Sequence, residues 1–277
     1  MKPYIAFLFI LFSFLSATAK IREVVVIDSA QIKVVYKRTT VTDTLHPKEK
    51  FKIDNLTLFA GKKGTAFYCV EARIHEEAMQ NGEYLLKLLE KPDNFNIQAA
   101  LTNDALFRNY EDNKSIENLR YDLAEWQYQE EIEKPQWTVG DSVQNILGYD
   151  CIMAKTDFRG RRWIAFFAPE IPLTEGPWKL CGLPGMILKA HDEKKHYTYE
   201  AIGLETQNAG NVEYFNYSDR YYVKNRKKGL QYRSKTLNLD IAAKIRAKTG
   251  LDLPSNPNLL EEEKKNYDFE EMDYPHE

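Results

Sequence analysis

The stretch GPWKLCGLPGMILKAHD, from Gly176 to Asp192, decides how this sequence folds, because it places three glycines and two prolines around the start of one apolar run. Proline fixes its own φ at about −65° and disfavours the helical region for the residue before it. Gly185 follows Pro184 and can take a positive φ without a steric penalty. The pattern therefore predicts a type II turn with Pro184 at the second position and Gly185 at the third.

The residues after this turn, Met186 to His191, predict a strand that is apolar at first and alternates later. Gly176 and Pro177 predict a second bend upstream. Trp178 and Leu180 then lie on a short segment between two bends, which either plugs the end of a core or forms the rim of a pocket. We call Gly176–Gly185 the corner, and assign structural roles in and around it to Gly176, Pro177, Gly182, Met186, Ile187 and Cys151.

The N-terminal residues have the pattern of an export signal. Lys2 precedes an apolar run from Ile5 to Leu15, and Ala17-Thr18-Ala19 supplies a small-x-small cleavage site. This pattern is typical of a secretory signal peptide, here over residues 1–19. The residue directly after the expected cut is not a cysteine, so the pattern does not indicate a lipid-anchored N-terminus. No later apolar run reaches the roughly 18 residues of a membrane span. We therefore expect an exported protein, periplasmic or associated with the outer envelope, that is soluble once the leader is removed.

Composition predicts one folded unit with a charged end. The sequence is 43% hydrophobic and 13% aromatic, which is enough to fill a core. We expect a single β-rich domain over residues 20–255 and an acidic, mobile tail over 256–277. The net charge of −3 argues against a general nucleic-acid binder. Nine Lys or Arg from Lys224 to Lys248 precede eight acids from Glu261 to Glu277, so these segments can pair, or the basic one can face membrane phosphate.

Short apolar or alternating runs predict strands along most of the chain, including Ile21–Ile27, Ile32–Thr42, Cys151–Thr156, Trp163–Phe167 and Tyr197–Leu204. Gly61–Gly64 predicts a hairpin turn between two of them. Helical spacing predicts helices over Glu76–Glu90 and Asn238–Lys248. Many short strands with few helices predict a mainly β (α+β) fold built on a large antiparallel sheet with one or two helices.

Three cysteines, Cys69, Cys151 and Cys181, are an odd number for an oxidising compartment. At most one internal disulfide can form. Cys151 and Cys181 can pair if their strands are neighbours, which depends on geometry that the sequence does not contain. Cys69 lies in an apolar run and is explained as a small buried hydrophobe.

The corner resembles the signature of a known family. Gly182–Ile187 is similar to the motif of the GLPGLI family, secreted proteins of Bacteroidetes-type bacteria with no established activity. The likeness also takes in Tyr128–Glu130, Trp137, Ile146–Cys151, Ala154, Phe158–Trp163, Ile171–Leu173 and Gly176–Trp178. Met186 replaces the leucine of the signature, Phe166-Phe167 lacks an expected tryptophan, and the C-terminal third matches loosely. The resemblance implies a curved, half-barrel-like sheet similar to that of periplasmic lipoprotein carriers.

Signatures of catalysis are weak. The sequence has no G-x-S-x-G elbow, and His75 does not begin an H-E-x-x-H motif because residue 79 is methionine. Cys151 with His191 resembles a nucleophile and its base, but a cysteine in an apolar strand is more often packing. Solvated turn residues explain His191, Asp192, Glu193 and His196 better than a metal site does. We therefore expect no catalytic residue, no metal and no cofactor.

Three arginines, Arg159, Arg161 and Arg162, crowd one predicted hairpin tip beside Trp163. Guanidinium groups bind phosphate and carboxylate through paired hydrogen bonds, so this tip is a candidate anion site. A solvated hairpin tip is the simpler explanation.

Two hypotheses for function remain. The first, which we favour, is a non-catalytic binding protein for an apolar ligand or an envelope partner, with a site at Trp178, Leu183, Pro184, Gly185, Arg159, Arg161 and Trp163. The second is a hydrolase that acts on envelope material, and it requires two of Glu170, Glu175 and Asp192 to meet at one substrate site.

Overall fold

A computed structural model describes residues 21–79, 104–121, 124–217, 220–237 and 269–274 of the chain. Strands dominate, and two helices accompany them. In chain order the elements are β1 (Ile21–Ser29), β2 (Ile32–Val41), β3 (Phe51–Ala60), β4 (Gly64–Tyr68), α2 (Val70–Met79), β5 (Ala105–Asn109), β6 (Lys114–Tyr121), β7 (Ala124–Glu131), β8 (Thr138–Ile146), β9 (Tyr149–Phe158), β10 (Arg161–Ala168), β11 (Met186–Asp192), β12 (Tyr197–Glu205), β13 (Asn211–Tyr217), β14 (Arg220–Tyr222) and α5 (Arg226–Leu237).

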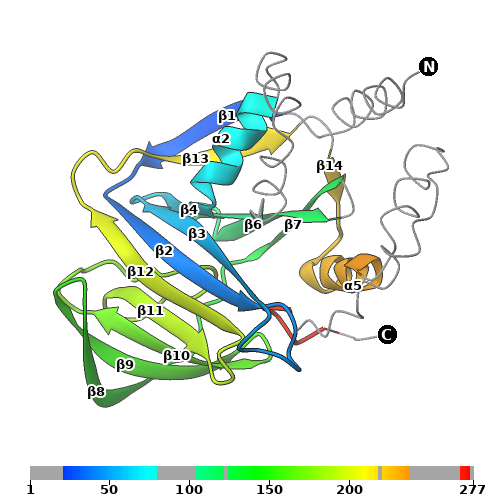
Figure 1. Cartoon of the computed structure of the whole chain (residues 1–277). Helices are drawn as coiled ribbons and strands as arrows, with labels where there is room; N and C mark the ends of the chain where they lie inside the picture. The colour runs from blue at the N-terminus through cyan, green and yellow to red at the C-terminus, as the bar shows by residue number, and fades with distance from the viewer. Residues whose placement is uncertain (1–20, 80–103, 122–123, 218–219, 238–268, 275–277) are drawn as a thin grey trace, which may run out of the picture.

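One sheet of 12 strands forms the body, in the order β14-β7-β6-β5-β4-β3-β2-β12-β11-β10-β9-β8. Its strand pairs are antiparallel except for β14 with β7, which is parallel. The sheet is curved and not closed, with β14 and β8 as its outermost strands (Figure 1). The predicted mainly β fold with a large, curved, half-barrel-like antiparallel sheet is confirmed.

Alternating side chains separate the inner face of the curved sheet from its outer face. On the inner face Val34, Leu58, Phe67 and Leu106 are cross-strand neighbours in one row from β2 to β5. All four are buried in the main core, which also contains Leu180 and other residues of the corner. The corner therefore fills the inner face rather than lying outside the sheet.

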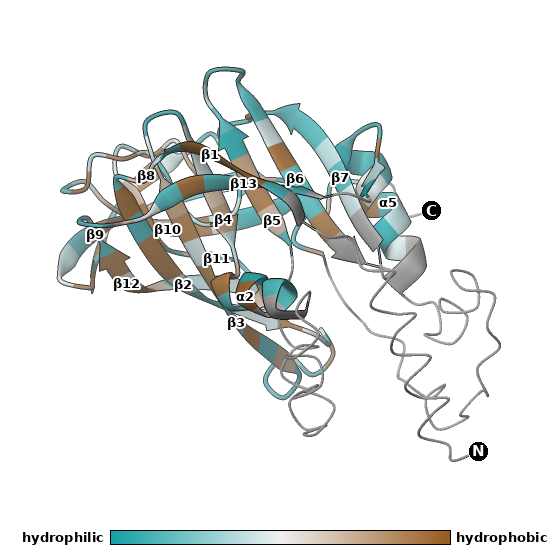
Figure 2. Cartoon of the chain, turned by 90° about the horizontal axis from the view of Figure 1, so that it is seen from above, coloured by the Kyte–Doolittle hydropathy of each residue, from teal (hydrophilic) through white to brown (hydrophobic). Residues whose placement is uncertain are grey.

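A second, two-stranded sheet of β1 and β13 covers part of the outer face. Phe215 of β13 contacts the rings of Tyr68 and Phe107 at 5.0 and 5.7 Å between centroids, in a separate apolar cluster. Helix α2 lies beside this layer, whereas α5 lies at the β14 end of the large sheet, beside β7 and β14 (Figure 1). Figure 2 shows that β7 and α5 are mostly hydrophilic, so the sheet has one end that is rich in polar side chains.

The hairpin at Gly61–Gly64 forms as predicted, between β3 and β4. The predicted helix over Glu76–Glu90 begins earlier, at Val70, and its part beyond Met79 lies outside the described residues. The leader at 1–19 and the predicted helix at Asn238–Lys248 also lie outside them. Helix α5 was not predicted, because its apolar residues do not recur at helical spacing.

The turn at Pro184 is tighter than the predicted type II turn, and that prediction is wrong. The N–H of Gly185 donates to the carbonyl of Leu183 at 2.8 Å, which closes a three-residue turn around Pro184. The N–H of Met186, which a type II turn would direct to Leu183, donates instead to the carbonyl of Ile171 at 3.1 Å. The φ of Gly185 is 153°, whereas the third residue of a type II turn has a φ of about +80°.

Replacing Gly185 with alanine tests how closely the corner approaches the sheet. A Cβ at this position would lie 2.3 Å from the carbonyl oxygen of Ala168, a backbone atom held in β10. We expect Gly185→Ala to lower the free energy of unfolding by about 3 kcal/mol. Gly148→Ala is the matched control, because Gly148 also has a positive φ, 89°, but nothing lies within 4 Å of an added Cβ. We expect a loss of about 1 kcal/mol there. Equal losses in urea unfolding would contradict the packing argument.

Candidate functional site

The aromatic residues of the corner lie inside the protein, not on a rim. Trp163 and Trp178 are 0% and 5% exposed, and their ring centroids are 5.4 Å apart. Leu183 is also fully buried, whereas Pro184 is exposed. The sequence suggested that the segment of Trp178 and Leu180 either borders a pocket or plugs a core, and the structure places Trp178, Leu180, Leu183 and also Trp163 in the core.

The residues given structural roles hold the corner against the sheet. Gly182 and Ile187 donate backbone hydrogen bonds to the carbonyls of Thr174 and Glu175, at 2.7 and 2.8 Å. An added Cβ on Gly176 would lie 2.7 Å from the carbonyl oxygen of Leu180, so only glycine fits there without movement. Pro177 and Met186 are buried.

The three cysteines are buried free thiols, so no disulfide joins Cys151 to Cys181. Burial raises the pKa of the Cys151 thiol to about 11. A thiol with so high a pKa is protonated near neutral pH and is a poor nucleophile. Cys151 therefore packs in the core of β9, as its apolar sequence neighbours indicated.

The arginines of the β9–β10 turn divide between the interior and the solvent. Arg162 points outward, is exposed, and pairs with Asp157 at 3.1 Å. The side chains of Arg159 and Arg161 are only 8% and 5% exposed. They pair with carboxylates of Glu130 at 3.0 Å and Asp192 at 3.0 Å. Two of the three predicted anion-binding arginines thus face the interior, where they bind carboxylates of this chain.

Lys179, in the middle of the corner, is the centre of this charged interior. Its ammonium nitrogen lies 2.8 Å from Glu117, 2.8 Å from Glu130 and 2.5 Å from Glu271. The residue is 5% exposed, a rare environment for lysine. Burial lowers the pKa of Lys179, but the three carboxylates outweigh it and the net pKa is raised. Lys179 is therefore a buried, permanently charged ammonium group.

Local backbone geometry directs Lys179 into the sheet. Trp178 has a φ of +53°, a conformation that a bulky side chain rarely adopts. A turn closes around it, with the N–H of Leu180 donating to the carbonyl of Pro177 at 3.1 Å. The carbonyl of Trp178 accepts a hydrogen bond from the buried guanidinium of Arg108, which in turn pairs with Glu175 at 2.6 Å. This network holds the strained turn and hence the position of Lys179.

Two of the three carboxylates around Lys179 come from the neighbouring strands β6 and β7. Glu117 of β6 is the cross-strand partner of Tyr128 of β7, whose hydroxyl donates to it. Burial raises the pKa of Glu117 more than Lys179 lowers it. Farther along the inner face, Arg38 of β2 pairs with Asp54 of β3 at 2.9 Å. The inner face therefore carries charged groups at β6 and β7 and also at β2 and β3.

Residues 269–274, with the sequence FEEMDY, are bound to this charged part of the inner face. Glu271 contacts Lys179, and it also pairs with Arg226 of α5 at 2.5 Å. Asp273 pairs with Arg226 at 2.6 Å. Figure 1 shows this segment, in red, beside α5. The sequence predicted a mobile acidic tail over 256–277, but Phe269, Glu271 and Tyr274 are buried.

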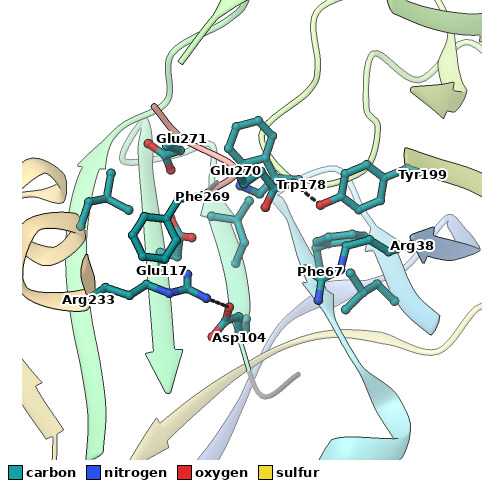
Figure 3. A pocket seen from close by; sticks show the side chains of 14 residues that line it. Arg38, Phe67, Asp104, Glu117, Trp178, Tyr199, Arg233, Phe269, Glu270 and Glu271 are labelled. Carbon is teal, nitrogen blue, oxygen red and sulfur yellow. Dashed lines mark hydrogen bonds and ion pairs between the residues drawn. The ribbon is translucent and has the colours of Figure 1, made fainter. Parts of the chain in front are cut away.

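Main-chain groups of the segment are bound as well. The Nε of Arg161 donates to the carbonyls of Phe269 and Glu270, at 3.1 Å each. The N–H of Met272 donates to the carbonyl of Arg159 at 2.8 Å. The hydroxyl of Tyr199 donates to the carboxylate of Glu270 (Figure 3). Both the backbone and the acidic side chains of this peptide are therefore recognised. We call the residues that hold it, Arg159, Arg161, Lys179, Tyr199 and Arg226, the acid cradle.

Apolar contacts fix the two ends of the segment. The rings of Phe269 and Tyr274 lie 5.8 Å apart and pack with Leu230 of α5. The guanidinium of Arg233 lies 5.2 Å from the centre of the Phe269 ring. The hypothesis that the basic segment after Lys224 pairs with the acidic end is confirmed for Arg226.

Two spaces adjoin the acid cradle. A cavity of about 40 Å³ lies between the segment and the inner face, lined by Arg38, Leu56, Phe67, Trp178, Tyr199, Glu270 and others (Figure 3). An open basin of about 440 Å³ lies on the other side, lined by Gln129, Glu130, Arg159, Asn225, Arg226, Lys227, Lys228 and Gln231. The first is large enough for one or a few waters, and the second for part of a ligand.

The carboxylates required by the hydrolase hypothesis have separate environments. Glu175 pairs with Arg108, and Asp192 pairs with Arg161 and accepts a hydrogen bond from the N–H of Tyr197 at 2.7 Å. Glu170 is exposed. Within the described ranges no group of three His, Cys, Asp or Glu is placed to hold a metal ion. No helix among the described residues is long and apolar enough to cross a membrane.

The sequence did not indicate that Lys179 or Glu271 belongs to a site. Lys179 stands between Trp178 and Leu180 in an apolar corner, and a lysine flanked by buried residues is the one local signal. Its partners are 49 and 92 residues away in Glu130 and Glu271, so no local pattern connects them.

No family model and no curated protein matches this sequence. Two crystal forms of PNGF-II are similar to this chain in structure, with TM-scores of 0.47 and 0.46, each at 12% sequence identity. The alignments cover 75% and 74% of this chain. The chain spans about a third of the PNGF-II chains, 33% and 32%. A similarity of this extent carries no conclusion about activity.

Replacing Lys179 tests whether the ammonium group holds the site together. Lys179→Met removes the one cation that Glu117, Glu130 and Glu271 share, and we expect the free energy of unfolding to fall by about 3–5 kcal/mol. Lys189→Met is the control, because Lys189 pairs with Glu200 at 3.6 Å near the surface. We expect at most about 1 kcal/mol there. Losses within about 1 kcal/mol of each other in urea unfolding would contradict a central role for Lys179.

Glu270 should make the stability of the folded protein depend on pH. Burial raises the pKa of Glu270 to about 7, although Arg38 and the Tyr199 hydroxyl lower it and Glu117 and Glu271 raise it further. The folded state then holds a proton that the unfolded state releases above about pH 4.5. Stability from this group is therefore greatest at low pH and is lost as the pH rises from about 4.5 to about 7.

In Glu270→Gln this loss should disappear. We expect the unfolding free energy of the wild type to fall, relative to the variant, by about 1–3 kcal/mol between pH 5 and pH 8. Urea titrations of both proteins at the two pH values measure the difference. Parallel pH profiles would show that Glu270 does not titrate in this range.

Proposed function

We propose that this chain is an exported envelope protein of the GLPGLI type that binds a partner without converting it, and that the acid cradle is its binding site. The leader pattern and the resemblance of Gly182–Ile187 support export and family. The bound segment 269–274 supports the binding role, because the inner face holds it as a site holds a peptide ligand.

The single observation that carries the proposal is the way this segment is recognised. Its acidic side chains are neutralised by Lys179 and Arg226, and its main chain is bound by Arg161 and Arg159. Contacts of both kinds are typical of peptide-binding sites, where main-chain bonds give affinity and side-chain contacts give specificity. A site of this construction selects a segment with carboxylates two residues apart, as in Glu271 and Asp273.

The interior favours a protein segment over a small apolar ligand. Of the residues expected to form a rim, Trp178 and Leu183 are packed in the core and Pro184 alone is exposed. The cavity beside them, about 40 Å³, is far smaller than the roughly 300–1,000 Å³ of pockets that hold small organic ligands. We therefore propose an envelope protein with an acidic segment as the partner.

Binding of the segment in trans tests this function. A chain ending at Asp268 lacks the bound segment, and a synthetic peptide with the sequence of residues 269–274 should restore it. We expect saturable binding by calorimetry and a rise in melting temperature of about 5 °C at saturation, because the ligand binds only the folded state. The control peptide carries Gln and Asn in place of Glu and Asp. Equal stabilisation by both peptides, or by neither, would contradict recognition of an acidic segment.

A further inference from the structure

We propose that residues 269–274 are a built-in competitor that closes the acid cradle, and that the partner displaces them with a longer acidic segment that also fills the basin beside α5. This proposal rests on the proposed function, because it assumes that the acid cradle binds an external segment. It adds how the site is regulated and which feature of the partner opens it.

The acid cradle keeps its geometry without the segment, because each cation also binds a carboxylate of the body. Lys179 keeps Glu117 and Glu130, both at 2.8 Å. Arg226 keeps Glu130 at 3.3 Å, and Arg159 keeps Glu130 at 3.0 Å. The site is therefore preorganised for a ligand, and release of the segment does not leave any of these three cations without a counter-ion.

Release of the segment leaves the site with more positive than negative groups. Lys179, Arg159 and Arg226 would then share the single carboxylate of Glu130, with Glu117 as the other buried acid within 4.0 Å of Lys179. Glu133 also contacts Arg159, at 3.1 Å, but its side chain is 59% exposed. Three cations facing two buried carboxylates attract an acidic ligand, so a vacant cradle is expected to bind one.

The segment is attached by contacts that can exchange. Apart from Phe269 and Tyr274 it contacts the body through ion pairs and hydrogen bonds. Among the described residues, it forms no strand of the sheet, and one backbone–backbone hydrogen bond, from Met272 to Arg159, joins it to the body. An external acidic segment can offer the same contacts, so the two occupants exclude each other.

A free peptide must bind more tightly than the segment does, because a tethered occupant acts at an effective concentration on the order of millimolar. The basin supplies the additional contacts. Lys227 and Lys228 line it, are exposed, and within the described part of the chain have no carboxylate within 4.0 Å.

A buried group also faces the basin. Arg159 lines it with a side chain that is 8% exposed, and its Nε donates no hydrogen bond, the carboxylate of Glu271 being 3.9 Å away. The first turn of α5 contains no acidic residue. Further carboxylates on a partner would therefore find the free Nε donor of Arg159 and the ammonium groups of Lys227 and Lys228, which the protein's own segment does not bind.

The first experiment compares the full-length wild type with variants that loosen the segment. Glu271→Gln combined with Asp273→Asn removes two carboxylates, and Met272→Pro alone removes the backbone donor while leaving the charges. The probe is the peptide of residues 269–274, followed by calorimetry, with melting curves to confirm folding. We expect either variant to bind the probe at least about tenfold more tightly than the wild type. If one variant fails to fold, the other variant tests whether the segment closes the site.

The outcomes separate the two proposals. Equal affinity of the wild type and a folded variant would overturn self-closure while leaving the proposed function intact. Failure of the probe to bind the folded variants and the chain ending at Asp268 would overturn both.

The second experiment tests the basin. The probe peptide is extended by two glutamates at each end, and we expect about fivefold tighter binding to the loosened variants. Lys227→Gln with Lys228→Gln should abolish this gain. Lys62→Gln with Lys63→Gln, in the β3–β4 turn, changes the net charge equally and should leave the gain unchanged. An equal effect of the two lysine pairs would show general charge attraction and overturn the assignment of the basin.

Discussion

The buried ammonium group of Lys179 is the interaction on which the rest of the site depends. A cation inside a protein is stable only where carboxylates surround it, and Lys179 has one each from β6, β7 and the C-terminal segment. These three parts of the chain are therefore held together by one charge. Since Lys179 belongs to the corner, the turn that fills the core also determines where the acidic groups of the inner face converge.

The corner performs two tasks because neighbouring residues point in different directions. Leu180 and Leu183 pack into the apolar core, whereas Lys179 enters the charged end of the inner face. This division requires Trp178 to adopt a positive φ, and the hydrogen bond from Arg108 to its carbonyl stabilises that conformation. The glycines and prolines around it supply close backbone approach and sharp turns. Packing and electrostatics are thus properties of a single short segment.

The sheet was predictable from the sequence, and the site was not. Strands such as Trp163–Phe167 and the turn at Gly61–Gly64 follow from local alternation and turn residues, which short windows contain. The acid cradle instead joins distant residues: 45 positions separate Arg226 from Glu271, and 108 separate Arg161 from Phe269. Composition was misleading for the C-terminal segment, because its acidity suggested that residues 269–274 were mobile, and they are bound. Apolar character could not distinguish a buried Trp178 from one that borders a pocket.

Buried ion pairs contribute little to stability compared with well-packed apolar residues of similar size. The charged end of the inner face is therefore poorly explained as a device for stability, particularly since the same sheet builds an apolar core a few residues away. Charges do supply specificity, because an occupant without matching carboxylates leaves Lys179 and Arg226 undercompensated. The segment at 269–274 meets this requirement, so the partner that we propose has to present carboxylates and main-chain groups to the same cations.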